Sequence, residues 1–212
     1  MPENPPARSV KIGDDERTGW SSERPRPEGS RPRPVDISGR CRVLSPSYRL
    51  RYSPGSLLLI VGSALTGPDQ FADRVIEERS APISLKRVRA LLSGRVLEAE
   101  IEERSQALLE AAVLKRLDQS QTVVIPIEGF DPAERERFTR PAHRLRRPRH
   151  LILLDGGRDE VADEERPALD ELRRAVDAGE VGQEGFQTAL RLGGSARAEL
   201  KRIIFQPPPR DD

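Results

Sequence analysis

The sequence has few of the residues that form covalent or metal-bound sites. Cys41 is the only cysteine, so no disulfide can form within the chain. His143 and His150 are the only histidines, and a zinc site needs several thiolates or imidazoles, so we expect no metal site. The longest strongly apolar run, LLLIV at 57–61, is far shorter than a membrane span. The start also lacks a basic segment followed by an apolar stretch, so we expect a cytoplasmic protein without membrane association.

Aromatic residues and an excess of one charge are also lacking. Aromatics make up 4% of the chain, and 36 Lys and Arg balance 35 Asp and Glu, which leaves a net charge of +1. This balance argues against a strongly basic nucleic-acid binder. The basic run RPRH and its neighbours at 140–150 could still contact phosphates, although we favour a solvated helix end and connector that Pro141 and Pro148 interrupt. The nucleic-acid candidates in this run are Arg144, Arg146, Arg147 and Arg149.

Residues 1–40 have almost no apolar side chains. They mix Pro, Ser, Gly, Arg and Glu, and such a segment cannot bury enough surface to offset its ordering entropy, which predicts a disordered Pro/Arg-rich arm. The stretch RPRPEGSRPRPV at 24–35 favours polyproline geometry. We favour a solvated tail, and the alternative is an arm that docks a protein partner. The folded domain is predicted at 41–209, with a short tail at 210–212.

Strands and helices are predicted to alternate through the folded part. Continuous apolar runs such as GSLLLIVG are typical of strands covered on both faces of a parallel sheet. The pattern therefore indicates an α/β domain. The predicted strands are 47–52, 55–62, 122–127, 150–155 and 200–206; the predicted helices are 68–79, 84–94, 96–119, 131–138 and 163–179. We expect RLGGSARAE at 191–199 to be a loop, because no buried strand leads into it.

The segment that follows the first apolar strand has the outline of a phosphate-binding loop. Gly62 and Gly67 stand five positions apart between a strand and an amphipathic helix. In the motif G-x-x-x-x-G-K-[ST], the glycines let backbone N–H groups surround phosphates, the Lys neutralises them, and the hydroxyl holds Mg²⁺. The residues that could still form such a cradle are Gly62, Ser63, Thr66, Gly67, Pro68 and Asp69.

Two residues of this loop are unsuited to phosphate. Pro68 stands where the Lys is expected, and it has neither a cation nor a backbone N–H. Asp69 stands at the hydroxyl position, and a carboxylate about 4 Å from a phosphate costs on the order of several kcal/mol. Asp69 could instead cap the helix, where the helix dipole favours a negative charge. We favour capping, so that the site carries its own internal anion.

Residues 53–209 resemble the small P-loop kinases of the zeta-toxin-like group, which includes polynucleotide-kinase-type domains. GSLLLIVGSALTGPDQFA matches the opening of that family apart from its Lys and hydroxyl, so the Walker A motif is degenerate. In SLKRVRALLSG, Lys86 stands where the family has the Asp that serves as base. In TVVIPIEGFDPAERER, Pro126 or Ile127 stands near the family's acidic position, and Glu128 is the only nearby carboxylate. Arg166 in DEERPALDEL is the candidate for the family's lid arginine.

The resemblance implies a P-loop NTPase-like three-layer α/β sandwich with a central, mainly parallel sheet of about five strands. Three separate loops depart from the family at their chemically demanding positions. We therefore expect that phosphoryl transfer is lost, that no cofactor is required, and that the domain is a binding or regulatory module. The first alternative is weak binding of ATP and Mg²⁺ with slow kinase or ATPase activity, in which Arg166 or Lys86 supplies the missing charge. The second alternative is partner docking through the arm.

Overall fold

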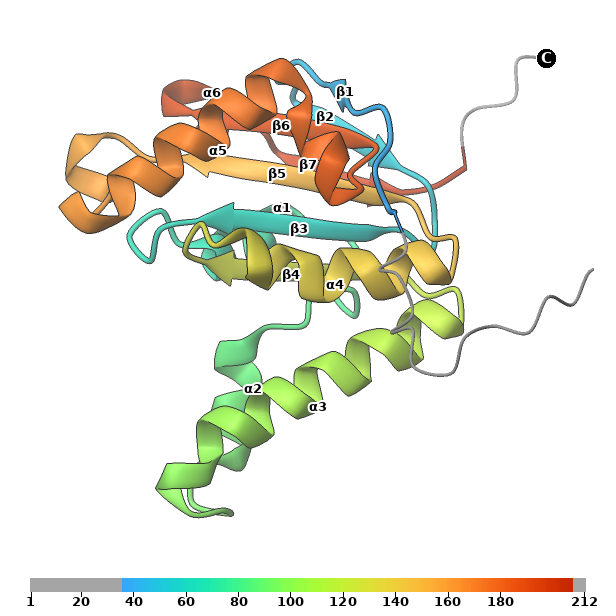
Figure 1. Cartoon of the computed structure of the whole chain (residues 1–212), viewed down its shortest axis with the longest axis vertical. Helices are drawn as coiled ribbons and strands as arrows, with labels where there is room; N and C mark the ends of the chain where they lie inside the picture. The colour runs from blue at the N-terminus through green and yellow to red at the C-terminus, as the bar shows by residue number, and fades with distance from the viewer. Residues whose placement is uncertain (1–35, 208–212) are drawn as a thin grey trace, which may run out of the picture. The chain divides into compact units, whose positions relative to one another are not determined.

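The computed structural model describes residues 36–207, so residues 1–35 of the arm predicted at 1–40, and the tail predicted at 210–212, lie outside the described residues. Strands and helices alternate along the chain, as Figure 1 shows. The strands are β1 (Arg42–Val43), β2 (Arg49–Tyr52), β3 (Leu57–Gly62), β4 (Val123–Glu128), β5 (Arg149–Asp155), β6 (Thr188–Gly193) and β7 (Arg202–Phe205). The α-helices are α1 (Pro68–Val75), α2 (Leu85–Leu92), α3 (Glu98–Asp118), α4 (Pro132–Arg144), α5 (Arg166–Ala178) and α6 (Gly194–Glu199). The 3-10 turns are η1 (Arg158–Glu160), η2 (Asp163–Glu165) and η3 (Glu180–Glu184).

A five-stranded sheet with strand order β1-β6-β5-β3-β4 forms the centre of the fold. Every neighbouring pair in it is parallel, and β3 lies between β5 and β4 with all six residues buried. Parallel strands need crossover connections, and helices supply them. The prediction of an α/β sandwich with a mainly parallel sheet of about five strands is confirmed.

The membership of this sheet differs from the prediction. The strands predicted at 47–52 and 200–206 pair with each other as a separate two-stranded ribbon, β2 with β7. Their places are taken by β1 and β6, which the sequence patterns did not reveal. β1 has only two residues, and β6 includes the charged Arg191, so neither has the continuous apolar run of a central strand.

The alternation of side chains along β3 builds a core on each face of the sheet. Leu57 and Leu59 pack with α3, α4 and α5, whereas Leu58 and Ile60 pack with α1 and the β2–β7 ribbon. Successive side chains of a strand point to opposite faces, so one strand supplies both cores. The result is three layers, in which the ribbon forms part of one outer layer.

Helices α2 and α3 form a hairpin, most of which extends away from the sheet (Figure 1). α2 has no buried residue. Helix α3 buries one stripe at every fourth position: Ile101, Ser105, Leu109, Val113 and Leu117. This spacing keeps the buried residues on one side of the helix and leaves the rest of α3 exposed, including a row of glutamates.

Two predictions about chain breaks are wrong. Helix α4 continues through Pro141 to Arg144. Pro141 has no N–H, so the carbonyl of residue 137 loses its helical hydrogen bond, and the helix ends three residues later. The segment at 191–199 is not a loop, since β6 leads into it and it continues as α6. The residues after Gly193 therefore follow a strand at the same edge of the sheet as the phosphate loop.

Arg135 has a structural role at the centre of α4. Its side chain is 4% exposed, pairs with Glu184 through two contacts of 2.7 Å, and donates to the Phe130 carbonyl. The planar guanidinium suits such two-point recognition of a carboxylate. The pair ties α4 to η3, which gives the arginine of the P-x-x-R sequence at 132–135 a structural role.

His150 is a buried, neutral side chain at the start of β5. Its ring stacks on Tyr52 with centroids 4.3 Å apart, and its Nδ1 lies 2.8 Å from the Thr188 hydroxyl. Burial, together with the nearby Arg149 charge, lowers the pKa of His150 to about 4. Protonation of this ring is therefore strongly disfavoured in the folded protein.

We expect stability to fall as the pH is lowered through the range between about 6.5 and 4. In that range the unfolded chain protonates His150 and the folded chain does not, so protons favour unfolding by up to about 3 kcal/mol. The measurement is urea unfolding between pH 7.5 and 4.5. His150→Gln should flatten this pH dependence, whereas the matched variant His143→Gln should retain it. An unchanged slope in His150→Gln would contradict the assignment.

Candidate functional site

The loop between β3 and α1 contains the predicted phosphate-binding residues. Gly67 adopts the left-handed conformation (φ 63°) and precedes Pro68, which begins α1 as predicted. Only Gly adopts this conformation without strain. The loop is short and tightly turned, so its hydrogen bonds decide whether its N–H groups are available to a phosphate.

The loop is closed on itself. The Thr66 N–H donates to the Ser63 hydroxyl at 3.1 Å, and the Thr66 hydroxyl donates to the Ser63 carbonyl at 2.9 Å. The Gly67 N–H also points to the Ser63 carbonyl, at 3.3 Å. A Cβ at Gly62 would lie 2.3 Å from the Thr66 hydroxyl oxygen, so the Thr66 side chain lies directly on Gly62. The side chains of Ser63 and Thr66 are therefore held within the loop.

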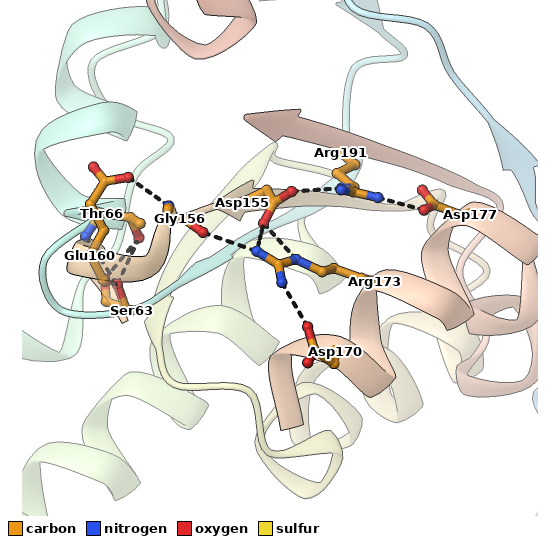
Figure 2. A network of polar contacts seen from close by, with 10 residues as sticks. Ser63, Thr66, Asp155, Gly156, Glu160, Asp170, Arg173, Asp177 and Arg191 are labelled. Carbon is orange, nitrogen blue, oxygen red and sulfur yellow. Dashed lines mark hydrogen bonds and ion pairs between the residues drawn. The ribbon is translucent and has the colours of Figure 1, made fainter. Parts of the chain in front are cut away.

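The segment after β5 closes the loop from the other side, as Figure 2 shows. The Ser63 hydroxyl donates to the Glu160 carbonyl at 2.5 Å. A Cβ at Gly156 would lie 2.8 Å from the Thr66 methyl and 2.9 Å from a Val161 methyl, so the two segments are in direct contact. Residues 156–161 therefore cover the loop between β3 and α1.

The fixed carboxylate beside the loop is Glu160, and the capping role predicted for Asp69 is wrong. The N-cap of α1 is Gly67, no side chain caps the helix, and Asp69 lies in its first turn. Glu160 accepts hydrogen bonds from Arg197 at 2.5 Å and from the Gly157 N–H at 3.0 Å. These two bonds, that from Arg197 first, lower the pKa of the Glu160 carboxyl. An internal anion is present, but it comes from the segment after β5.

Asp155 anchors a network of charges at the end of β5 (Figure 2). Its carboxylate is 10% exposed and lies between Arg173 of α5 and Arg191 of β6, each at 2.7 Å or less. Arg173 also donates to the Gly156 carbonyl at 2.9 Å, and Arg191 also pairs with Asp177. The network therefore holds the start of the covering segment in place.

A large cavity lies on the other side of β3, at the carboxyl end of β4. We call it the β4 cavity; its volume is about 910 Å³, within the range of small-molecule sites. It is bounded by α2, α3, β4 and α4. Its lining residues are Asp69, Leu85, Lys86, Arg89, Glu102, Glu103, Gln106, Ala107, Leu109, Glu110, Ile125, Pro126, Ile127, Glu128, Glu134, Arg137 and Phe138.

The β4 cavity brings together the departures that the sequence revealed in three separate loops. Asp69, Lys86, Pro126 and Glu128 all line it. The remaining loop residues, Gly62, Ser63, Thr66, Gly67 and Pro68, do not. Arg166 lies elsewhere: it pairs with Asp163, donates to the Arg158 carbonyl and lines a separate cavity of about 250 Å³. The structure therefore does not bring the predicted lid arginine to Lys86.

Sequence reasoning missed the contribution of α3 and α4 to this cavity. Glu102, Gln106 and Glu110 recur at every fourth position of α3, which places them on one face, and Arg137 faces them from α4. The spacing was visible in the sequence. The sequence did not indicate that these residues line a site, because an exposed row of polar residues is equally typical of a solvated helix.

Half of the basic run at 140–150 is used inside the fold. Arg149 is 7% exposed and donates to the carbonyls of Gly185 and Arg147. The Arg147 side chain donates to the Leu117 carbonyl, which ties it to the end of α3. Neither of these side chains is available for the predicted contacts with nucleic acid; Arg144 and Arg146 are exposed.

Between residues 36 and 207, no helix is both long and apolar enough to cross a membrane. Within the same range, no three acidic, histidine or cysteine side chains converge as metal ligands would.

No protein-family model and no curated protein matches the chain. Among solved structures, a Chloroflexus aurantiacus protein provisionally described as a kinase is similar, with 11% identity and a TM-score of 0.41 over 66% of this chain and 86% of that chain. The tunicamycin resistance protein of Deinococcus radiodurans is 15% identical, with a TM-score of 0.36 over 68% of this chain and 91% of that chain. These likenesses concern the course of the backbone and carry no argument about activity.

The Asp155 network yields a test of how the covering segment is held. We expect Asp155→Asn to lower the free energy of unfolding by about 2 kcal/mol, because two partly buried guanidinium groups lose their shared charge. The control is Asp177→Asn, which removes only an exposed pair with Arg191 and should cost less than about 1 kcal/mol. The measurement is guanidinium chloride unfolding. Equal losses of unfolding free energy in the two variants would contradict the anchoring role of Asp155.

Proposed function

We propose that this protein is a kinase-like domain that does not transfer phosphoryl groups and that serves as a binding or regulatory module. The single observation that carries the proposal is the closed loop between β3 and α1. The N–H groups of Thr66 and Gly67 are engaged by Ser63, and Pro68 has no N–H to offer. A polyphosphate needs several such donors together with a cation, and phosphoryl transfer depends on both.

The position of the covering segment supports the same conclusion. In open parallel sheets, ligands bind outside the carboxyl ends of the strands, where the connections of two adjacent strands diverge. Here that point lies between β3 and β5, because β3 connects towards β4 and β5 connects towards β6. The crevice at this point is filled by Thr66, Gly156 and Glu160. A nucleotide would have to displace this packing.

The alternative of weak ATP binding has little support from the charges nearby. Arg166 lies by another cavity, and Lys86 lines the β4 cavity, which none of the residues from Gly62 to Pro68 lines. No cofactor is required for the proposed role. The β4 cavity remains accessible beside the closed loop, so the binding function is assigned to it.

The test is titration calorimetry with ATP and Mg²⁺ at millimolar concentration, combined with transfer of labelled phosphate to nucleic-acid ends and small hydroxyl compounds. We expect neither heat nor transfer. Heat that disappears in Gly67→Val but persists in the matched variant Gly94→Val would place the nucleotide in the loop and overturn the proposal. Both glycines have positive φ, so both substitutions strain the backbone, but only Gly67 belongs to the loop.

A further inference from the structure

The β4 cavity has an apolar floor beneath a charged mouth. Ile125 and Phe138 are almost fully buried and face it from β4 and α4, with Pro126, Ile127 and Leu109 beside them. Sites for small organic molecules are mostly apolar with a few charged groups that fix the ligand's orientation. The floor can therefore contact an apolar part of a ligand, and the charges at the mouth select the sign of the ligand's charged group.

Carboxylates outnumber cations around the mouth by six to three. Both arginines are already neutralised by acids: Arg89 pairs with Glu102 at 2.5 Å, and Arg137 lies 3.5 Å from both Glu110 and Glu134. Among the described residues, three lining carboxylates have no ion-pair partner. They are Asp69, Glu103 and Glu128.

Lys86 is the one lining cation without an ion pair among the described residues. Three unpaired carboxylates around one unpaired cation leave the mouth with excess negative charge. A cleft lined by one sign of charge, with low-dielectric walls, concentrates ions of the opposite sign. The mouth therefore attracts cations and repels phosphates and carboxylates.

We infer that the β4 cavity binds an organic cation: an amine or guanidinium group on an apolar body, with the cationic head between Asp69 and Glu128 and the body on the Ile125–Phe138 floor. The register of the sheet supports the position of the head, because Glu128 ends β4 opposite Gly62 of β3, and Asp69 lies in the first turn of the helix that follows β3. This inference rests on the proposed binding role and adds the chemical class of the ligand.

The experiment compares three probes that share one apolar body: 4-phenylbutylamine, 4-phenylbutanol and 4-phenylbutanoate. Ligand-observed NMR titration of the full chain suits the roughly millimolar affinities of small fragments. We expect the amine to bind at least about 5-fold more tightly than the alcohol, and the carboxylate not to bind. Raising the salt concentration from 0.05 to 0.5 M should weaken the amine but not the alcohol, because salt screens only the charged contact.

Variants at the mouth locate the bound amine. Asp69→Asn combined with Glu128→Gln should weaken the amine by about 5-fold to 10-fold and leave the alcohol unchanged. Lys86→Met removes the competing cation and should tighten the amine by about 2-fold to 5-fold. The control is Glu164→Gln, an exposed acid on η2 outside the cavity, which should change neither. Because the amine and alcohol are compared within each variant, a loss of folding would weaken both probes and would be recognised.

The outcomes separate this inference from the proposed function. Equal affinity for amine and alcohol, or tighter binding of the carboxylate, overturns the organic-cation inference while the proposed function stands if ATP also fails to bind. Binding of the amine that is unaffected in Asp69→Asn/Glu128→Gln overturns the location of the head. Binding of ATP and Mg²⁺ in the loop overturns the proposed function without deciding the ligand of the β4 cavity.

Discussion

The contact between Thr66 and Gly156 decides how closely the two loops at the carboxyl edge of the central sheet can pack. With any larger residue at 156, the side chain would meet the Thr66 methyl at 2.8 Å, and the segment after β5 could not lie against the phosphate loop. Because residue 156 is a glycine, the Ser63 hydroxyl reaches the Glu160 carbonyl, and the two loops close the crevice between β3 and β5. Within the loop, the N–H groups of Thr66 and Gly67 are engaged by Ser63, and Pro68 has no N–H.

The charge network around Asp155 connects this contact between the loops to the neighbouring elements α5 and β6. Arg173 joins the end of β5 to α5 and to the Gly156 carbonyl, and Arg191 joins it to β6. Glu160 is held in turn by Arg197 of α6. Each ion pair is partly exposed and contributes little alone, but together they fix the covering segment from three elements. On the other side of β3, the β4 cavity lies between α2, α3, β4 and α4.

Several structural features were predictable from short-range patterns. The buried strand 57–62, the helix that Pro68 begins, and the helix with Asp131 as its N-cap all follow from apolar runs and capping chemistry. Strand β6 was missed, because Arg191 breaks its apolar pattern and its partners, Asp155 and Asp177, lie outside the strand. Helix α4 tolerates Pro141 because the lost hydrogen bond lies close to the helix end, which a local rule about proline does not consider.

The alternation of elements and the absence of a cation at positions 68 and 69 follow from the sequence alone, because both depend on which residues stand next to one another along the chain. Only the tertiary structure decided which anion lies beside the loop, Glu160 instead of Asp69, and that Asp69, Lys86 and Glu128 face a single cavity. Those outcomes depend on contacts between residues that are far apart in the sequence. The parallel strands bring their carboxyl ends to one edge, and the packing of side chains there then fills one crevice and leaves the other open.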